Sequence, residues 1–444
     1  MMRKQLFLLD CAIRHPRTFI EYRRLITQQQ MSRDELFAYN WALRKKILLH
    51  AYETSPFYGA LYRSAGFHPH DLVTPADWCK VPVLRRSQIA ECRAQIVSTT
   101  ATSKDLFSVA TGGSTGSVLQ SYHDTRYPLG IIGWRMLESW GLDPSVHMAC
   151  IYRATENINH RHHSWIATRL KEYVSKQILL DASSMTEASA KDFLNKYNRL
   201  GPAILHGYVG GLNHLAEYLC MRDMNIQRPL AVWSTAGPIS SVQRSLFERT
   251  FDAPIYDQYG SCEVYWIAAE CTRHEGLHIN SDVRHVDFIG ENGEDVAFGS
   301  TGEIAVTDLV NYAFPLIRYL NGDMGYAIEK PCSCGIKFPL MGSVGGRVSE
   351  TMVFPNQVAI SGEYLTTIFD SYPEVVRAFQ VVQRKDLSLH VRVVPNVHEA
   401  ALAPILEIVK MQLNQKTGGC VPICISSVDS ISSDRGKLRY IIKE

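Results

Sequence analysis

The sequence has no long apolar run, no large excess of charge of one sign and no repeat or low-complexity tract. Because no uncharged apolar stretch reaches the roughly 20 residues that a helix needs to cross a bilayer, we expect no integral membrane span. The 46 basic and 44 acidic residues leave a net charge of +2, which gives no electrostatic basis for nucleic acid as a partner. At 444 residues the chain is too long for one ordinary core, so we expect at least two domains.

The beginning of the chain does not have the pattern of a signal peptide. Its short apolar patch, Leu6–Leu9, is followed by Asp10 and Arg14, and no small-residue cleavage site is evident. A weak surface attachment through residues 1–16 stays open as an alternative. Cysteine occurs eleven times, an odd number spread over the chain, which favours a reducing, cytoplasmic setting over a disulfide framework.

Hydrophobic spacing predicts a long helix over Ser32–Thr54 that begins at a capping box of Ser32 and Glu35. Short β-type runs then alternate with helical stretches, which is typical of an α/β domain whose sites lie in loops at strand ends. The expected strands are Met148–Tyr152, Ala203–Tyr208, Leu230–Thr235 and Pro254–Tyr259, and the expected helices are Thr186–Leu200 and Leu212–Arg222.

The pattern changes after Gly345-Gly346-Arg347, where a small α+β module begins. The expected elements are helices near Ser361–Ser371 and over His398–Gln415, and strands over Val376–Val382, Leu387–Val394 and Val421–Val428. The predicted fold class is therefore α/β. It has a large N-terminal domain, residues 1–346, whose residues 1–95 are mostly helical, and a small α+β C-terminal domain, residues 347–444.

One glycine-rich segment has the composition of a phosphate-binding loop: Thr111-Gly112-Gly113-Ser114-Thr115-Gly116-Ser117. Its glycines permit close backbone approach, and its hydroxyls and N–H groups can surround phosphate oxygens. It is not a Walker A loop, because no lysine follows Gly116, and its glycine spacing is not that of a dinucleotide-binding loop. A plain flexible loop is the alternative.

Three further segments carry candidate chemistry. In Tyr256–Glu263, an aromatic ring beside a glycine can stack on a purine, and Glu263 offers a hard oxygen ligand for Mg²⁺. In Pro315–Asp323, the carboxylate of Asp323 follows a glycine turn and can accept hydrogen bonds from ribose hydroxyls. Near the C-terminus, Lys437 is a candidate catalytic cation. Taken singly, the three segments are better explained as a strand end, an Asn-Gly-Asp turn and a tail charge.

In this order the four segments resemble the adenylate-forming superfamily. Within it the chain is most similar to the phenylacetate–CoA ligase family and to its branch of capsular-polysaccharide-biosynthesis proteins. The resemblance covers nearly the whole chain. The other segments that carry it are Tyr52–Tyr58 and Val81–Leu84, similar to the family's opening helices, His206-Gly207-Tyr208 and Ser234–Gly237, similar to its acyl-pocket strands, and Gly346-Arg347.

The resemblance implies an adenylate-forming ligase fold with a mobile small domain, and a ligase that uses ATP and Mg²⁺ to convert a carboxylic acid to an acyl-AMP. Because an anion attacks a polyanion in this reaction, a cation must be placed where charge grows, and a moving domain would deliver it. The implied roles are phosphate binding for Thr111, Gly113, Ser114, Thr115 and Gly116, adenine contact for Tyr259 and Gly260, Mg²⁺ for Glu263, ribose for Asp323, hinge and nucleotide contact for Arg347, and charge stabilisation for Lys437.

The acid and the acceptor stay open. The resemblance places His206, Tyr208, Trp233, Ala236 and Gly237 at an acyl pocket that would suit an aromatic or modest apolar acid. After the hinge, Ser361-Gly362-Glu363 departs from the glycine- and proline-containing motif of typical CoA ligases. CoA, a carrier-protein thiol and an amine are therefore equal candidates for the acceptor, in polysaccharide or secondary-metabolite biosynthesis. A monomer and a homodimer are both compatible with the sequence.

Three cysteines and a histidine form the only grouping with metal-site chemistry: Cys271, His278, Cys332 and Cys334. Three thiolates and an imidazole suit a tetrahedral, structural Zn²⁺, and relatives have a similar pattern. His274 is a rival fourth ligand, and ordinary unligated cysteines are the alternative. The cluster of His160, His162 and His163 is better explained as a solvated loop, or as part of the substrate mouth, than as a metal site.

Two other classes of protein are alternatives to a ligase. A non-catalytic relative could serve as a binding or scaffold protein in polysaccharide assembly, but the presence of Lys437, Asp323 and Glu263 counts against it. A kinase or P-loop NTPase is disfavoured because Gly-Lys-Ser/Thr is absent after the glycine-rich loop. Release of AMP and pyrophosphate, rather than ADP, would separate these classes.

Overall fold

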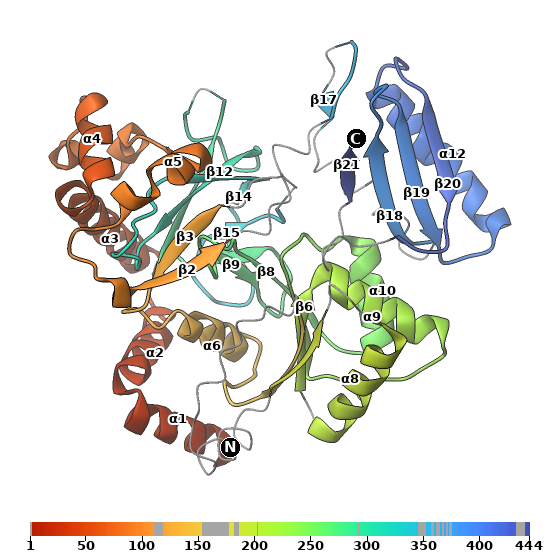
Figure 1. The fold of residues 1–444 in the computed structure, drawn as a ribbon, viewed down its shortest axis with the longest axis horizontal. Coiled ribbons are helices and arrows are strands. Elements are labelled where there is room, and N and C mark those ends of the chain that lie inside the picture. Colours follow the sequence, from red (N-terminus) through yellow and green to blue (C-terminus); the bar gives the residue numbers. More distant parts are fainter. Residues whose placement is uncertain are drawn as a thin grey trace. The chain divides into compact units, whose positions relative to one another are not determined.

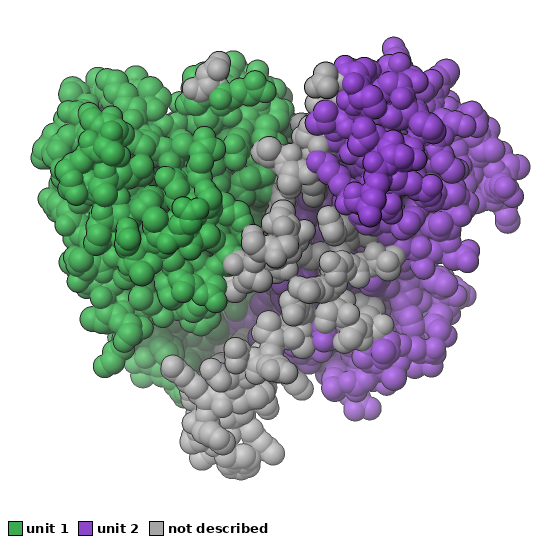
Figure 2. All heavy atoms as spheres, turned by 45° about the horizontal axis from the view of Figure 1, so that its top comes forward, with its two compact units in different colours: residues 1–144, 258–344 green, residues 145–257, 345–444 purple. Residues whose placement is uncertain are grey.

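The chain folds into two compact units, which Figure 2 shows in green and purple. Unit 1 comprises residues 1–144 and 258–344, and unit 2 comprises residues 145–257 and 345–444. The computed structural model describes residues 2–110, 119–152, 177–181, 186–201, 203–291, 293–344, 352–356, 359–360, 365, 368–369, 372, 375–431 and 440–444. The predicted domain boundary lies in an undescribed stretch, 345–351, and stays a prediction.

Helices form the N-terminal part of unit 1 (Figure 1). The long helix α3 begins at the predicted capping box, because the Ser32 hydroxyl accepts from the Glu35 N–H at 3.3 Å and the Glu35 carboxylate accepts from the Ser32 N–H at 2.8 Å. The α-helices are α1 Met2–Arg14, α2 Pro16–Gln28, α3 Arg33–Thr54, α4 Pro56–Ser64, α5 Arg86–Ile96 and α6 Gly130–Ser139, and the 3₁₀ helices are Pro69–Asp71, Pro75–Lys80 and Ser103–Asp105.

Three groups of strands complete unit 1. One sheet has the order β1-β13-β12-β11, in which β1 runs parallel to β13 and the others pair antiparallel. In a second group the strands are neighbours in the order β14-β15-β10-β9, and each pairs antiparallel with the next. The strand β9 also pairs antiparallel with the last residues of β8. The strands β2 and β3 form a separate antiparallel pair. Their bounds are β1 Leu84–Arg85, β2 Leu106–Ala110, β3 Gln120–Asp124, β9 Ala268–Glu270, β10 Leu277–Ile279, β11 Arg284–Ile289, β12 Gly302–Asp308, β13 Tyr319–Gly325, β14 Ala327–Ile328 and β15 Leu340–Met341.

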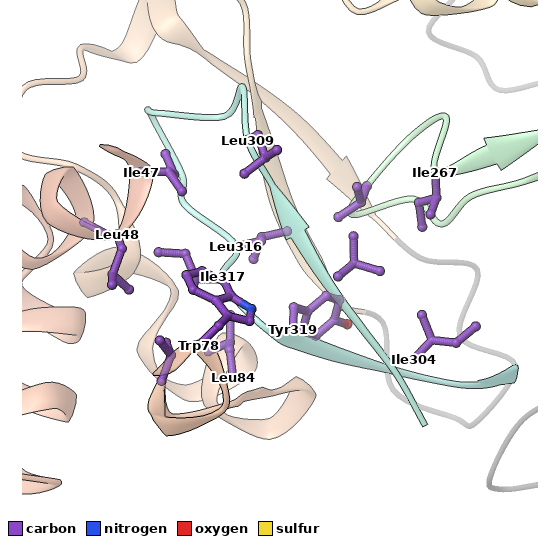
Figure 3. Packing of buried hydrophobic residues seen from close by; sticks show 14 of the residues in the cluster. Ile47, Leu48, Trp78, Leu84, Ile267, Ile304, Leu309, Leu316, Ile317 and Tyr319 are labelled. Atoms are coloured by element: carbon purple, nitrogen blue, oxygen red, sulfur yellow. The ribbon is translucent and has the colours of Figure 1, made fainter. Parts of the chain in front are cut away.

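The core of unit 1 joins these helices to the sheets. Ile47 and Leu48 of α3 are fully buried in the same cluster as Trp78, Ile317 and Tyr319 (Figure 3). Burial of each large apolar side chain contributes about 1.5–3 kcal/mol relative to exposure. The packing of α3 therefore fixes the strand β13, which carries predicted site residues.

The first half of unit 2 is a parallel sheet with helices. Strands β5, β4, β6 and β7 are neighbours in that order and pair parallel, and β8 follows β7. In a parallel sheet the carboxyl ends of the strands lie at one edge, where ligands bind in α/β folds. The bounds are β4 His147–Tyr152, β5 Gln177–Asp181, α8 Glu187–Leu200, β6 Ala203–Tyr208, α9 Val209–Met221, β7 Ala231–Thr235, α10 Ser241–Phe251 and β8 Ile255–Tyr259, and these confirm the strands and helices expected here within three residues.

The C-terminal module of unit 2 has its own sheet and apolar cluster. The order is β20-β19-β18-β21, with β18 and β19 antiparallel and the outer strands parallel to their neighbours. Val381, Val391 and Val409 are fully buried in its core. Its elements are β16 Met352–Val353, β17 Ala359–Ile360, β18 Val376–Gln383, β19 Leu389–Pro395, α12 Glu399–Lys416, β20 Ile423–Ser427 and β21 Ile441–Lys443. Most of the helix expected near Ser361–Ser371 lies outside the described residues. Among the described helices, none has the length and apolarity that crossing a bilayer requires.

Candidate functional site

The end of β8 in unit 1 holds three predicted site residues in a tight turn. Tyr259 is the last residue of the strand, and a Cβ at Gly260 would come within 2.9 Å of Gln258 Nε2 and 3.0 Å of the Trp266 backbone nitrogen. Only glycine fits there without a shift. The Ser261 N–H donates to the Val264 carbonyl at 2.9 Å, which closes the turn that presents Glu263.

Glu263 is buried, at 3% exposure, and its Oε1 atom has two donors. Arg86 Nη1, at the first residue of α5, donates to Oε1 at 3.0 Å, and the Tyr319 hydroxyl donates at 3.1 Å. Burial first, and then the charge of Glu263, raises the pKa of Tyr319. Sequence reasoning missed Arg86, although the signal was there: it is the second of two arginines directly after the segment Val81–Leu84.

Asp323 lies against Tyr259. The Tyr259 hydroxyl donates to Asp323 Oδ2 at 2.9 Å, and Asn321 Nδ2 donates to the Tyr259 hydroxyl oxygen at 2.5 Å. The expected glycine turn before Asp323 is wrong, because Asn321–Asp323 is part of β13, with a positive φ of 83° at Gly322 and an irregular register against β12. The strand thus brings Asp323 to Tyr259 and Tyr319 to Glu263.

The second group of predicted residues lies in unit 2, after β6 and β7. Tyr208, Ala236 and Gly237 line a small cavity together with Val209, Gly210, Pro238 and Tyr440. Ala236 has a φ of 66°, a left-handed conformation that costs a non-glycine residue roughly 1–2 kcal/mol. Strain of this kind gathers at binding sites, where the surroundings hold it in place.

The other two predicted acyl-pocket residues, His206 and Trp233, are stacked beneath the strand ends. They pair across β6 and β7, and their rings lie 4.0 Å apart at 15°. Burial lowers the pKa of His206 to about 3, so the ring is neutral near pH 7, and a hydrogen bond joins its Nε2 to the hydroxyl of Tyr152. Tyr152, the last residue of β4, was missed, and its position at a parallel strand end was the available signal.

The predicted metal ligands converge in unit 1. The ligand atoms of Cys271, His278, Cys332 and Cys334 all lie within 4.8 Å of one another. The sulfurs of Cys271 and Cys332 are 3.5 Å apart, and the Cys334 sulfur is 3.3 Å from His278 Nε2. These separations fit a tetrahedral zinc site, in which Zn–S bonds of about 2.3 Å place sulfurs about 3.8 Å apart.

The surroundings of this cluster also suit a cation. His278 Nδ1 lies 3.3 Å from the Phe338 carbonyl oxygen, the kind of contact that orients a metal-binding imidazole through its other nitrogen. Burial raises the pKa of Cys332 to about 12 and that of Cys271 as well, so both stay protonated unless a cation stabilises the thiolates. The rival ligand His274 pairs instead with Glu270, Nδ1 to Oε2 at 3.2 Å.

The remaining predicted residues fall outside the part of the chain that the structure describes. They are the loop residues Thr111, Gly113, Ser114, Thr115 and Gly116, the hinge residue Arg347, the catalytic candidate Lys437, and the histidines His160, His162 and His163. Their roles stay predictions.

The fold is that of the adenylate-forming ligases, and the predicted fold class is confirmed. The chain is similar over 94% of its length to 91% of a 2-hydroxyisobutyryl-CoA ligase in the postadenylation state in complex with R3-HIB-AMP, with a TM-score of 0.77 and 18% sequence identity.

Comparisons of sequence show which proteins with this fold the chain resembles. Residues 352–444 match the model of the CapK C-terminal domain. Protein CapK of Staphylococcus aureus is 22% identical over 259 residues, 56% of this chain and 54% of that protein. A phenylacetate-coenzyme A ligase of Thermus thermophilus is 28% identical over 135 residues, 30% of each chain. The chain therefore aligns with about half or less of these relatives' lengths. The predicted resemblance to phenylacetate–CoA ligases and to capsular-polysaccharide proteins is confirmed.

Proposed function

We propose that the chain is an ATP-dependent, AMP-forming ligase that adenylates a carboxylic acid and transfers the acyl group to a thiol or an amine. The observation that carries this proposal is the convergence of Tyr259, Asp323 and Glu263 on the end of β8 and on β13, within a fold of this class. An aromatic ring, a carboxylate and a buried glutamate are the groups that a purine, a ribose and a magnesium ion require.

In this reaction Tyr259 and Gly260 flank the adenine. Asp323 has one carboxylate oxygen engaged by the Tyr259 hydroxyl, which orients the group for the ribose hydroxyls. Glu263 serves as the Mg²⁺ ligand, since a buried carboxylate suits a hard cation. Bound Mg²⁺ supplies neutralisation of triphosphate charge, and Arg86 balances the charge of Glu263 beside it.

The chemical step depends on residues outside the described part of the chain. Ser114, Thr115 and Gly116, with Thr111 and Gly113, hold the phosphates. Lys437 stabilises the charge that develops when the substrate carboxylate attacks the α-phosphate, and Arg347 contacts the nucleotide at the hinge. Preorganised donors of this kind typically contribute about 10²–10³ in rate each.

The acid binds at the carboxyl ends of β6 and β7. Tyr208, Ala236 and Gly237 offer an aromatic and small-residue lining, which favours an aromatic or modest apolar acid. The stacked pair of His206 and Trp233 lies on the same two strands, and burial keeps His206 neutral near pH 7 by lowering its pKa. CoA, a carrier-protein thiol and an amine stay equal as acceptors.

A structural Zn²⁺ at Cys271, His278, Cys332 and Cys334 is part of the proposal, because the donor set and its spacing suit that ion. The likeness to CapK supports a place in polysaccharide or secondary-metabolite biosynthesis. The proposal also includes a cytoplasmic location and a monomeric or homodimeric state.

The nucleotide products test the reaction type. Purified protein with ATP, Mg²⁺, a panel of acids and hydroxylamine as acyl trap should yield AMP and an acyl hydroxamate. ADP as the product would contradict the proposal. A chain that binds no ATP would instead favour a non-catalytic scaffold.

A further inference from the structure

The helices α1 and α2 of unit 1 pack against each other, and both contact α6 (Figure 1). Lys4 Nζ pairs with Glu138 Oε1 at 2.6 Å, and the ring of Phe7 lies edge-on to Trp134 at 5.0 Å. From α2, the Tyr22 hydroxyl donates to the same Glu138 oxygen at 2.7 Å. These contacts show which side of each helix faces α6. The opposite side of each helix is the one whose exposure matters here.

The solvent side is apolar. On α1 the spacing of three and four residues places one row of side chains opposite Phe7, and α2 adds one more. These residues, which we name the α1–α2 face, are Leu6, Leu9, Ile13 and Ile20, with exposures of 45%, 57%, 72% and 63%. An apolar group of this kind, rimmed by polar residues, marks a binding surface.

The segment that carries the α1–α2 face is basic, although Lys4, Arg14 and Arg24 are paired with Glu138, Asp10 and Glu21. Residues 1–30 contain six Lys or Arg against two Asp or Glu, a net charge of +4, whereas the whole chain carries +2. The remaining 414 residues are therefore net negative, at −2. Arg17 and Arg23 are exposed and stand three residues before and after Ile20, so they flank it along α2.

We propose that the α1–α2 face docks on the surface of an anionic phospholipid membrane. The apolar side chains would enter the boundary between headgroups and acyl chains, and the arginines would meet lipid phosphates, as in other interfacial amphipathic helices. A second copy of this chain is a poorer occupant, because a two-fold contact would bring two patches of like charge together. The inference is independent of the ligase reaction.

Co-sedimentation of the full chain with vesicles tests this. The probes are vesicles of phosphatidylcholine with about one third phosphatidylglycerol, and vesicles of phosphatidylcholine alone. We expect binding to the first, little to the second, and weakening when salt is raised from about 0.1 M to 0.5 M. The triple variant Leu6→Ser, Leu9→Ser, Ile13→Ser should lower binding at least about tenfold. The charge variant Arg17→Glu, Arg23→Glu should also lower it.

Met411→Ser, at an exposed apolar residue of α12, is the matched control and should bind like the parent. Thermal unfolding of each variant checks that the fold is retained. No binding to anionic vesicles, or binding that the triple variant leaves unchanged, would overturn the proposal. So would a parent dimer that the triple variant converts to a monomer without any vesicle binding, because the face would then be covered by a second copy.

Discussion

Arg86 Nη1 donates to Glu263 Oε1 at 3.0 Å, so the buried carboxylate proposed as the magnesium ligand already has a cationic partner from a different part of the sequence. Arg86 is about one third exposed and Glu263 almost fully buried. The pair therefore holds a charge that would otherwise be uncompensated in the interior, and it links α5 to the turn after β8.

Removing either member of this pair should lower the free energy of unfolding, and the two losses should not add in the double variant. Because Arg86 is partly screened by solvent, we expect Arg86→Gln to lower the free energy of unfolding by only about 1 kcal/mol. Glu263→Gln should cost a similar amount, and the double variant less than the sum. Urea unfolding of the parent, the two single variants and the double variant gives the coupling free energy between Arg86 and Glu263. Strict additivity would mean that the two side chains do not interact in solution.

Glu263 should also be needed for magnesium-dependent catalysis. Glu263→Gln keeps the shape of the side chain and one acceptor oxygen but removes its charge, so adenylation should fall by about 10²–10³ and require more Mg²⁺. The measurement is the rate of acyl-hydroxamate formation against Mg²⁺ concentration. A Mg²⁺ dependence identical to the parent's would remove Glu263 from the metal site.

Asp323 should act on nucleotide affinity. Asp323→Ala removes the proposed acceptor of the ribose hydroxyls, and we expect the KM for ATP to rise about tenfold or more, equivalent to about 1.4 kcal/mol. Tyr259→Phe removes only the hydroxyl that donates to Asp323 and should give a smaller rise. If both variants change kcat and leave the KM for ATP unchanged, the nucleotide assignment fails.

The cysteine cluster should contain one zinc ion per chain. Cys332→Ser should lose the metal and lower the thermal midpoint by about 5 °C or more, since a metal that binds only the folded state stabilises it. Metal content is measured by elemental analysis. The control is Cys79→Ser, at an exposed cysteine of the same unit, which should keep both the zinc ion and the thermal midpoint of the parent. Equal metal content in the two variants would contradict the assignment.

His206 should make unit 2 less stable in acid. Its pKa is lowered by burial to about 3 in the folded chain, against 6.5 for an ordinary histidine. Between these values the unfolded state binds more protons, so stability is full above pH 6.5 and is lost as the pH falls toward 3. His206→Gln should flatten this dependence relative to the parent. Urea unfolding at pH 7 and pH 5 measures it, and an unchanged difference between the two pH values would exclude the effect.

Local signals made much of the fold predictable. The capping box of Ser32 and Glu35 predicted the beginning of α3, and short β-type runs predicted the strands β4, β6 and β7. The sheet of β11, β12 and β13 was not predicted, although each of its strands pairs with the next one along the chain. Asp323 was assigned to a glycine turn because Asn321-Gly322-Asp323 has the composition of a turn, whereas pairing with β12 includes these residues in β13 with an irregular register.

The candidate residues that follow a motif were named from the sequence, and those that meet through packing were missed; the roles of all of them stay predictions. Tyr259, Glu263 and the four Cys/His residues were identified from their segments. Arg86 and Tyr152 were missed although each had a local signal: Arg86 follows the segment Val81–Leu84, and Tyr152 ends β4. Their contacts with Glu263 and His206 arise from packing between segments that are distant in the sequence.

The most direct test of the proposed reaction is acid-dependent release of pyrophosphate from ATP and Mg²⁺. The acids are a panel of aryl, fatty, hydroxy and amino acids, and Lys437→Ala is the control. We expect release with one class of acid and a loss of about 10²–10³ in rate in the variant. Release that Lys437→Ala leaves unchanged, or the absence of ATP binding by the parent chain, would contradict the account.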